Sequence, residues 1–387
     1  MDINSLTQKY KQYVINLRRE FHRIPEPSFK EFKTSERIKA ELNNLDIPFI
    51  TTGATGIVAE IKGNGKGKTV ALRTDMDALQ ITECTNINFK SQNEGYMHAC
   101  GHDGHIASLL CAAKVLMELQ NEFNGTVKLI FQPAEENGLG AKTIIDAGFL
   151  RDVDGIFGIH FLPTLDFGKI SVEAGPRMAS ADSFKITVKG KACHGATPQE
   201  GVDSIVAASA IVMNLQSIVS REINLLEPAV VSVGKFNSGT SYNIIAGEAQ
   251  LEGTVRCFSC DTQKKIADKI ERIVSNTAKT YNAEGIVEYN YLVPPVINNF
   301  ETSKIAKNAA VKIFSYDNVV DVNKLFIAED FSKYLNIVPG TFAFVGTRNF
   351  KKETIYPLHN DKFNIDEDSL PLAAAMHVQF AVDFLTR

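Results

Sequence analysis

"HIASLLCAAKVLMELQNEFNGTVKLIFQPAEE", residues 105–136, contains two successive apolar patterns that decide the fold. Residues 105–120 predict a long helix, and residues 125–136 predict an apolar strand that ends in acidic residues. Further strands are expected over 56–63, 68–79 and 154–161, and helices over 4–24, 33–45 and 368–387. Strands that alternate with long helices indicate an α/β fold with a mixed, largely parallel sheet and flanking helices. Ligands of such sheets bind at the carboxyl ends of the strands.

The sequence pattern changes after about residue 178. A strand over 180–192 alternates apolar and polar residues and opens the order strand–helix–strand–strand–helix–strand. The remaining expected elements are helices over 201–222 and 261–283 and strands over 228–236, 243–258 and 285–293. This order is typical of a small α+β unit of the split βαβ type. We therefore expect an inserted domain over 179–293, and a larger domain built from 1–178 and 294–387.

Composition excludes several classes of protein. The chain has 387 residues, a formal net charge of -4 and 44% hydrophobic residues, so it can bury a large core and has no strongly basic surface for nucleic acid. No apolar run approaches the roughly 20 residues that span a bilayer, and the first residues do not resemble a secretory signal. Six cysteines in this length are not a disulfide framework. We expect a cytoplasmic globular protein without membrane or nucleic-acid partners.

"MHACGHDGH", residues 97–105, concentrates nitrogen and sulfur ligands in one loop. Cys100 and His102 are residue types that bind borderline-soft divalent metals, and the helix that follows them has Asp103 as its expected N-cap. A metal needs further donors, and the chain offers them after other apolar strands and in a turn. These candidates are Glu135, Glu136, His160 and His359.

Other interpretations of these residues compete with a metal site. Cys100 is a possible thiol nucleophile, but His102 is not readily placed as its base from two residues away on one loop. His160 alone reads more often as a structural histidine, and adjacent glutamates are usually a solvated pair. Two acids at the mouth of a sheet repel unless a cation or distinct roles separate them. We therefore favour a metal site, with one glutamate as ligand and its neighbour as general base.

Five segments together resemble the M20 family of metallopeptidases and amidohydrolases. They are 73–79 "RTDMDAL", 97–105 "MHACGHDGH", 131–137 "FQPAEEN", 158–160 "GIH" and 357–361 "PLHND". The similarity is strongest to the subgroup of hippurate hydrolases, N-acyl-amino-acid amidohydrolases and auxin-conjugate hydrolases. It extends from residues 17–31 to residues 357–363 and so covers essentially the whole chain.

The resemblance implies a catalytic domain with two divalent metals and an inserted lid or dimerisation domain. Cys100 bridges the two cations in place of the carboxylate that most M20 enzymes use. Glu136 and His359 complete one metal site, and His102 and His160 the other. Glu135 matches the general base. Asp77 matches an acid that supports the site, although residue 75 is Asp where most relatives have a metal-binding His.

The resemblance also assigns roles to residues of the inserted domain. His194, in "KACHGATPQEGVD" (191–203), polarises the scissile carbonyl and commonly reaches across from the partner of a homodimer. Asn243 and Arg256 match a pair that holds a free carboxylate of the substrate, and Arg offers the bidentate fork this needs.

The expected enzyme is a metal-dependent amidohydrolase that cleaves N-acyl amino acids with zinc or manganese, or with cobalt or nickel. A dipeptidase or aminopeptidase of the same family is the first alternative, and its substrate is a dipeptide or other short peptide. From other classes, a Cys100-dependent thiol hydrolase and a non-catalytic protein that binds metal or carboxylate remain open.

Overall fold

The computed structural model describes residues 2–386. The chain divides into two compact units. Unit 1 contains residues 1–175, 297–323 and 330–387, and unit 2 contains residues 176–296 and 324–329. Residues 324–329, expected in the larger domain, group with unit 2 because Leu325 pairs with Met178 and its N–H donates to the carbonyl of Arg177. Strands β7 (Gly175–Met178) and β14 (Val296–Asn298) carry the chain between the units.

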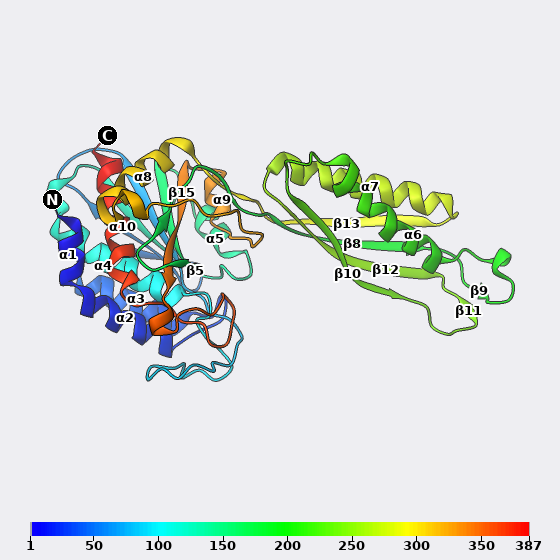
Figure 1. The fold of residues 1–387 in the computed structure, drawn as a ribbon, viewed down its shortest axis with the longest axis horizontal. Coiled ribbons are helices and arrows are strands. Elements are labelled where there is room, and N and C mark those ends of the chain that lie inside the picture. The colour runs from blue at the N-terminus through cyan, green and yellow to red at the C-terminus, as the bar shows by residue number, and fades with distance from the viewer. Residues whose placement is uncertain (1, 387) are drawn as a thin grey trace. The chain divides into compact units, whose positions relative to one another are not determined.

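Unit 1 is built around a sheet of seven strands in the order β1-β2-β4-β3-β5-β15-β6. Figure 1 shows the paired strands β5 and β15 of this sheet. Its strands are β1 (Phe49–Thr52), β2 (Gly56–Lys62), β3 (Thr69–Asp75), β4 (Thr126–Gln132), β5 (Gly155–Asp166), β6 (Ile170–Ser171) and β15 (Gly340–Arg348). Strands β4, β3, β5 and β15 are parallel, while β1, β2 and β6 pair antiparallel with their neighbours. The expected mixed, largely parallel sheet is confirmed.

Helices cover this sheet and complete the core of unit 1. They are α1 (Ile3–Lys9), α2 (Lys11–Arg23), α3 (Phe32–Asn44), α4 (His102–Glu118), α5 (Gly140–Asp146), α8 (Phe300–Phe314), α9 (Ser332–Leu335) and α10 (Ser369–Leu385). Helices α4 and α10 pack side by side and are almost entirely buried. Strands covered on both faces need continuous apolar runs, which explains why β3, β4 and β5 lack an alternating pattern.

The carboxyl ends of the parallel strands position the site. β3 ends at Asp75, β4 ends at Gln132, and both strands run in the same direction. The turn after β4 passes through Ala134 with φ +53°, a left-handed conformation that is unusual for alanine. Helix α4 begins at His102 after Gly101, whose φ of +92° favours glycine, so the expected N-cap at Asp103 is wrong by two residues.

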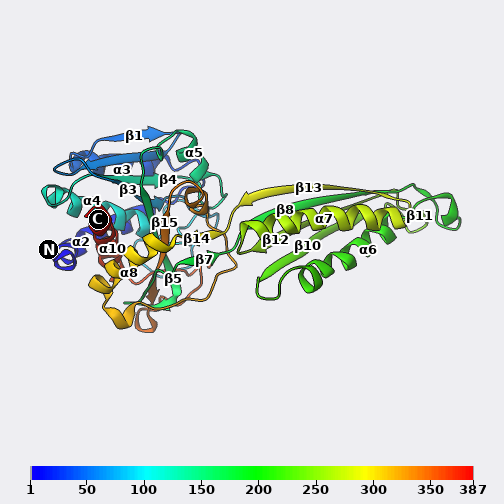
Figure 2. The same cartoon turned by 90° about the horizontal axis from the view of Figure 1, so that it is seen from above.

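Unit 2 is an antiparallel sheet of four strands in the order β10-β12-β8-β13. Its elements are β8 (Ala181–Lys189), β9 (Cys193–His194), α6 (Ser204–Ser217), β10 (Ala229–Ser238), β11 (Ile244–Ile245), β12 (Glu248–Cys257), α7 (Cys260–Thr280) and β13 (Glu284–Val293). Figure 2 shows α6 and α7 beside each other, and both helices pack on the sheet. The expected split βαβ order is thus present, with β9 and β11 as an added pair.

One helix qualifies the expectation that no segment is long and apolar enough for a membrane. Ser204–Glu222, which is α6 and its π-helical end, meets that requirement by length and composition alone. Its apolar side chains Ala208, Ile211 and Leu215 are buried in the core of unit 2. Packing against the sheet accounts for these buried side chains, whereas Ile205, Val206 and Met213 of the same helix are exposed.

Candidate metal centre and general base

Three donors converge from separate elements at the carboxyl edge of the sheet of unit 1. Cys100 ends the loop before α4, His102 begins α4, and His160 lies on β5. The Cys100 Sγ lies 3.3 Å from the His160 Nε2, and all three side chains are buried. Their ligand atoms lie within 4.8 Å of one another, a spacing that fits one metal ion.

A second group of donors shares Cys100 with the first. It contains Cys100, Glu136 and His359, again with ligand atoms within 4.8 Å of one another. The His359 Nε2 lies 3.6 Å from the Glu136 Oε2. The backbone N–H of His359 donates to the carbonyl of Ala99 at 2.9 Å. The structure thus brings together the five candidate ligands around one thiol.

Two buried atoms in this centre test whether a cation fits. Among residues 2–386, the His102 Nε2 and the Glu136 Oε1 are buried without a hydrogen-bond partner, and they lie 3.9 Å apart. Buried polar atoms are normally paired, so each of these two atoms lacks a partner that a bound cation would supply. Imidazole, thiolate and carboxylate are suitable ligands for zinc and related divalent metals. The residues present fit two such ions.

The ligands are oriented by neighbours that do not face the metal positions. The His102 Nδ1 donates to the carbonyl of Asp77 at 2.9 Å, which turns the Nε2 into the site. The His160 Nδ1 lies 2.7 Å from the carbonyl of Phe161 and leaves its Nε2 toward Cys100. Both imidazoles therefore present the nitrogen that a metal needs.

Asp77 holds the backbone of the two adjacent glutamates. Its Oδ1 accepts from the N–H of Glu135 at 3.0 Å, and its Oδ2 accepts from the N–H of Glu136 at 3.1 Å and from the Ser28 hydroxyl at 2.6 Å. Asp77 is fully buried and makes these contacts with both oxygens. Asp77 is therefore positioned to orient the turn that carries Glu135 and Glu136.

Asp75 supports the site indirectly, through its contacts with His105 and Arg73. Its Oδ1 accepts from the His105 Nδ1 at 2.7 Å, and its Oδ2 accepts from the Arg73 guanidinium at 2.9 Å. The His105 Nε2 in turn accepts from the backbone N–H of Phe161 at 3.0 Å, next to His160. His105, three residues after His102 on the same helix face, was expected to support the site at most, whereas the sequence analysis left out Arg73. An arginine inside an apolar strand was the available signal, because a buried charge must be paired.

The electrostatics of the centre favour a cation. Burial alone would lower the pKa of His102, but the carboxylates of Asp75, Asp77 and Glu136 raise it to about 10. Burial raises the pKa of Glu136 to about 7, with Asp77 and Asp75 adding to the effect against the opposing charge of His102. Several acids crowd one buried space, and positive charge placed there would relieve their repulsion.

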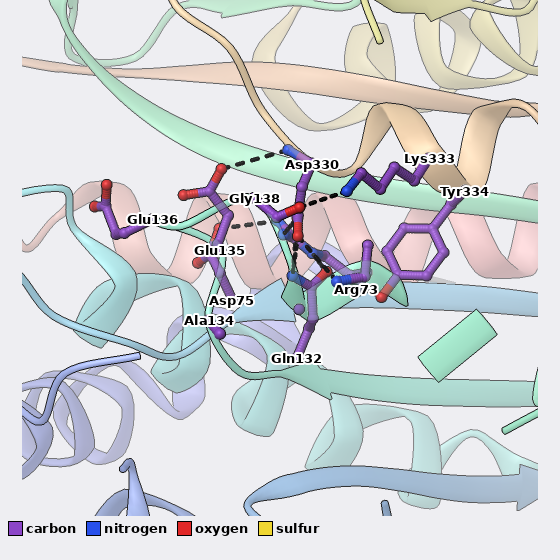
Figure 3. A network of polar contacts seen from close by, with 12 residues as sticks. Arg73, Asp75, Gln132, Ala134, Glu135, Glu136, Gly138, Asp330, Lys333 and Tyr334 are labelled. Carbon is purple, nitrogen blue, oxygen red and sulfur yellow. Dashed lines mark hydrogen bonds and ion pairs between the residues drawn. The ribbon is translucent and has the colours of Figure 1, made fainter. Parts of the chain in front are cut away.

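Glu135 lies beside this centre and is almost buried. A ligand atom of its side chain lies within 4.8 Å of those of His102 and Glu136. One of its carboxylate oxygens, Oε1, is 3.4 Å from the backbone N–H of Asp330 (Figure 3). The two adjacent glutamates therefore hold different positions, with Glu136 in the donor group around Cys100 and Glu135 next to it.

The candidate residues of unit 2 are not gathered in one place. His194 on β9 and Asn243 before β11 are exposed neighbours, since Ile244 pairs with His194 and the Gly195 N–H donates to the Asn243 carbonyl. Arg256 lies eight residues beyond Glu248 along β12, whereas β9 and β11 adjoin the Glu248 end. At about 3.3 Å per residue this is roughly 26 Å of strand. Within one chain, Arg256 is thus remote from His194 and Asn243.

Residues 71–383 match the family described as Peptidase family M20/M25/M40. Thermostable carboxypeptidase 1 of Saccharolobus solfataricus is 40% identical over 97% of this chain and 96% of its own length. An N-acetylcysteine deacetylase of Bacillus subtilis is 39% identical over 95% and 96%. The solved YXEP protein of Bacillus subtilis, described as a dinuclear metal binding peptidase, superimposes with a TM-score of 0.88 at 36% identity over 98% and 99% of the chains.

The chain therefore belongs to the M20 family, as its motifs predicted. It is a metal-dependent hydrolase of the amidohydrolase and peptidase type.

Proposed function

We propose that this protein hydrolyses the amide bond of N-acyl amino acids and releases a carboxylic acid and a free amino acid. The observation that carries the proposal is the pair Glu135 and Glu136, of which only Glu136 joins the donor group around Cys100. A site that only binds metal has no need of the second acid. Two relatives are named as a carboxypeptidase and an N-acetylcysteine deacetylase, and both names are compatible with an amide substrate.

Two divalent cations would be held by Cys100 together with His102 and His160, and by Cys100 together with Glu136 and His359. Zinc or manganese is preferred, with cobalt or nickel as alternatives. Imidazole and thiolate favour zinc, cobalt and nickel, and carboxylates suit manganese. When bound, the cations act as Lewis acids and lower the pKa of water toward neutrality.

Glu135 is the proposed general base and acid. It takes a proton from the attacking water and passes it to the leaving nitrogen, because a single positioned carboxylate can perform both transfers in sequence. Asp77 supports this role by holding the N–H groups of both glutamates. The support is rigid, since Asp77 is buried and also held by Ser28.

The substrate's carbonyl and carboxylate are assigned to residues of unit 2. His194 polarises the carbonyl, and Arg256 and Asn243 bind the carboxylate. Because Arg256 lies remote from the other two along β12, we infer that a homodimer supplies them from two chains. Exposed apolar side chains on α6, namely Ile205, Val206 and Met213, support an interface between copies. The six cysteines are free thiols rather than disulfides, which favours the cytoplasm as the location.

Two alternative functions are compatible with the same site. Peptide cleavage, by a dipeptidase or carboxypeptidase reaction, uses the same machinery and differs only in the acyl group. The 3.3 Å contact between Cys100 and His160 also suits a thiol nucleophile with its base.

Cys100→Asp separates the metal mechanism from the thiol mechanism. A carboxylate can bridge two metals but cannot act as a thiolate. We expect the variant to keep its metal ions, measured by mass spectrometry, and a turnover of N-acetyl amino acids that chelators abolish. Cys100→Ala, which removes the bridge, should lose both metal and turnover. Turnover lost in Cys100→Asp with full metal content would support the thiol hydrolase instead.

A further inference from the structure

Asp330, the residue at which the chain returns to unit 1, is surrounded by hydrogen-bond donors. Its Oδ1 accepts from Arg73 at 3.0 Å and from the Gln132 amide at 2.8 Å. Its Oδ2 accepts from the same amide at 3.0 Å and from the backbone N–H of Ala141 at 2.9 Å. The side chain is completely buried, so this carboxylate is fixed by its partners (Figure 3).

These partners lie at both ends of the turn that carries Glu135. Gln132 is the last residue of β4, and Ala141 lies in the first turn of α5. Between them, the Gly140 N–H donates to the Ala134 carbonyl at 3.0 Å, and a Cβ on Gly140 would lie 1.6 Å from the Pro133 carbonyl oxygen. The turn is therefore closed by an internal hydrogen bond, and the Asp330 carboxylate accepts hydrogen bonds from residues at both of its ends.

The segment after Asp330 adds two further contacts to the same turn. The Tyr334 hydroxyl donates to the Gln132 Oε1 at 2.9 Å, and the Lys333 ammonium donates to the Gly138 carbonyl. The backbone N–H of Asp330 points to the Glu135 Oε1 at 3.4 Å. Residues 330–334 thus contact the turn at Gln132, Gly138 and Ala141. They also contact the carboxylate of Glu135.

We infer that Asp330 is a positioning residue that fixes the carboxylate of Glu135 for proton transfer. Arg73 links Asp330 to the residues around the candidate metal centre, because it forms ion pairs with both Asp330 and Asp75. The inference rests on the proposed role of Glu135 as general base. A displacement of about 1 Å in such a group lowers the rate by roughly 100-fold.

Asp330→Asn is the sharpest substitution because it keeps shape and removes one acceptor. Every partner of Asp330 is a donor, so the new amide must place its NH₂ against a donor and lose at least one contact. We expect kcat to fall about 10- to 100-fold, with KM within about 3-fold and the metal content unchanged. Asp366→Asn is the matched control, since Asp366 is also buried among donors, Asn349 and Lys352, away from the turn.

A double-mutant comparison separates positioning from general structure. In a Glu135→Asp background the base is already displaced, so Asp330→Asn should reduce kcat much less than in the wild type. An equal reduction in both backgrounds, or a kcat within about 2-fold of wild type, would overturn the inference. Loss of metal in parallel with kcat would do the same.

Two further variants keep the test decisive. If Asp330→Asn does not fold, Tyr334→Phe removes one hydroxyl contact and should lower kcat about 2- to 10-fold, and an unchanged kcat would contradict the inference. Glu135→Gln tests the proposed function by itself. If Glu135→Gln stays active, the proposed function fails. If Glu135→Gln is inactive while Asp330→Asn is fully active, only the positioning role fails.

Discussion

The two units present their candidate functional residues in opposite ways. In unit 1, the donors around Cys100 are mostly buried, and His102 and His160 are oriented by backbone carbonyls of the same unit. In unit 2, His194 and Asn243 are exposed, and Arg256 lies about 26 Å of strand away from them. A preorganised centre can be completed by one chain, whereas separated, exposed groups need a second copy or a substrate to complete them.

Glu135→Gln should have the largest effect on kcat and would show how much unit 1 contributes to catalysis. The variant keeps the side-chain shape but cannot take a proton, so we expect kcat to fall about 10²- to 10⁴-fold. Metal content should equal that of the wild type, because the ligands are other residues. Steady-state rates and mass spectrometry on one preparation measure both. A rate near that of the wild type would remove Glu135 from the mechanism.

His194→Ala tests the contribution of unit 2. Loss of a group that stabilises an oxyanion should lower kcat about 10²- to 10³-fold without loss of metal. If the partner chain supplies His194, mixing this variant with Glu135→Gln chains forms mixed dimers with one intact site. Activity should then return to roughly a quarter of the wild-type value after subunit exchange. Two inactive variants that stay inactive after proven exchange would place His194 in its own chain's site.

The stability of the two units should depend differently on pH in the acid range. Hydrogen bonds and the charge of His22 lower the pKa of Glu83 in unit 1 from 4.5 to about 2, even though burial opposes this. A lowered pKa means that the stabilisation is complete above about pH 4.5 and is lost as the pH falls toward 2. Burial raises the pKa of Asp182 in unit 2, so acid does not remove its contribution.

The loss of the Glu83 contribution should therefore lower the stability of unit 1 as the pH falls. Thermal unfolding of the wild type and Glu83→Gln between pH 6 and pH 2 measures this, and the variant should show a flatter acid dependence. An acid dependence identical in both proteins would show that Glu83 is not responsible.

Met213→Glu should have the smallest effect on stability and a specific effect on assembly. Met213 is 71% exposed on α6, so the free energy of unfolding of the single chain should change by about 0.5 kcal/mol or less. A charge there should weaken a dimer that buries this face. Sedimentation at several concentrations measures the dissociation constant, and Lys307→Glu on unit 1 serves as the surface control. Equal dissociation constants would place the interface elsewhere.

Much of unit 1 could be predicted from the sequence because its signals are local. The apolar runs ending at Asp75 and Gln132 identify buried parallel strands, and strand ends of one sheet must meet at one edge. The positions of Cys100 and His102 before a helix followed from the same pattern. Their convergence with His359 did not, because more than 250 residues separate them and no periodicity reports such contacts.

The supporting residues were missed for a physical reason. Arg73 and Asp330 stand 257 positions apart, and their pairing depends on how α9 packs against the end of β4. The left-handed conformation of Ala134 could not be anticipated either, since alanine rarely adopts it. In unit 2, the family resemblance implies that Asn243 and Arg256 act as a pair, and their positions near opposite ends of β12 separate them within one chain.

The most direct test of a two-metal centre at Cys100 is a titration that follows metal content and rate together. Metal per chain is measured by mass spectrometry while a chelator removes it and added zinc or manganese restores it, with an N-acetyl amino acid as substrate. A two-metal hydrolase predicts close to two ions per chain, with activity lost and regained in step with them. Activity that persists after complete removal of metal would contradict it and return Cys100 to the role of a nucleophile.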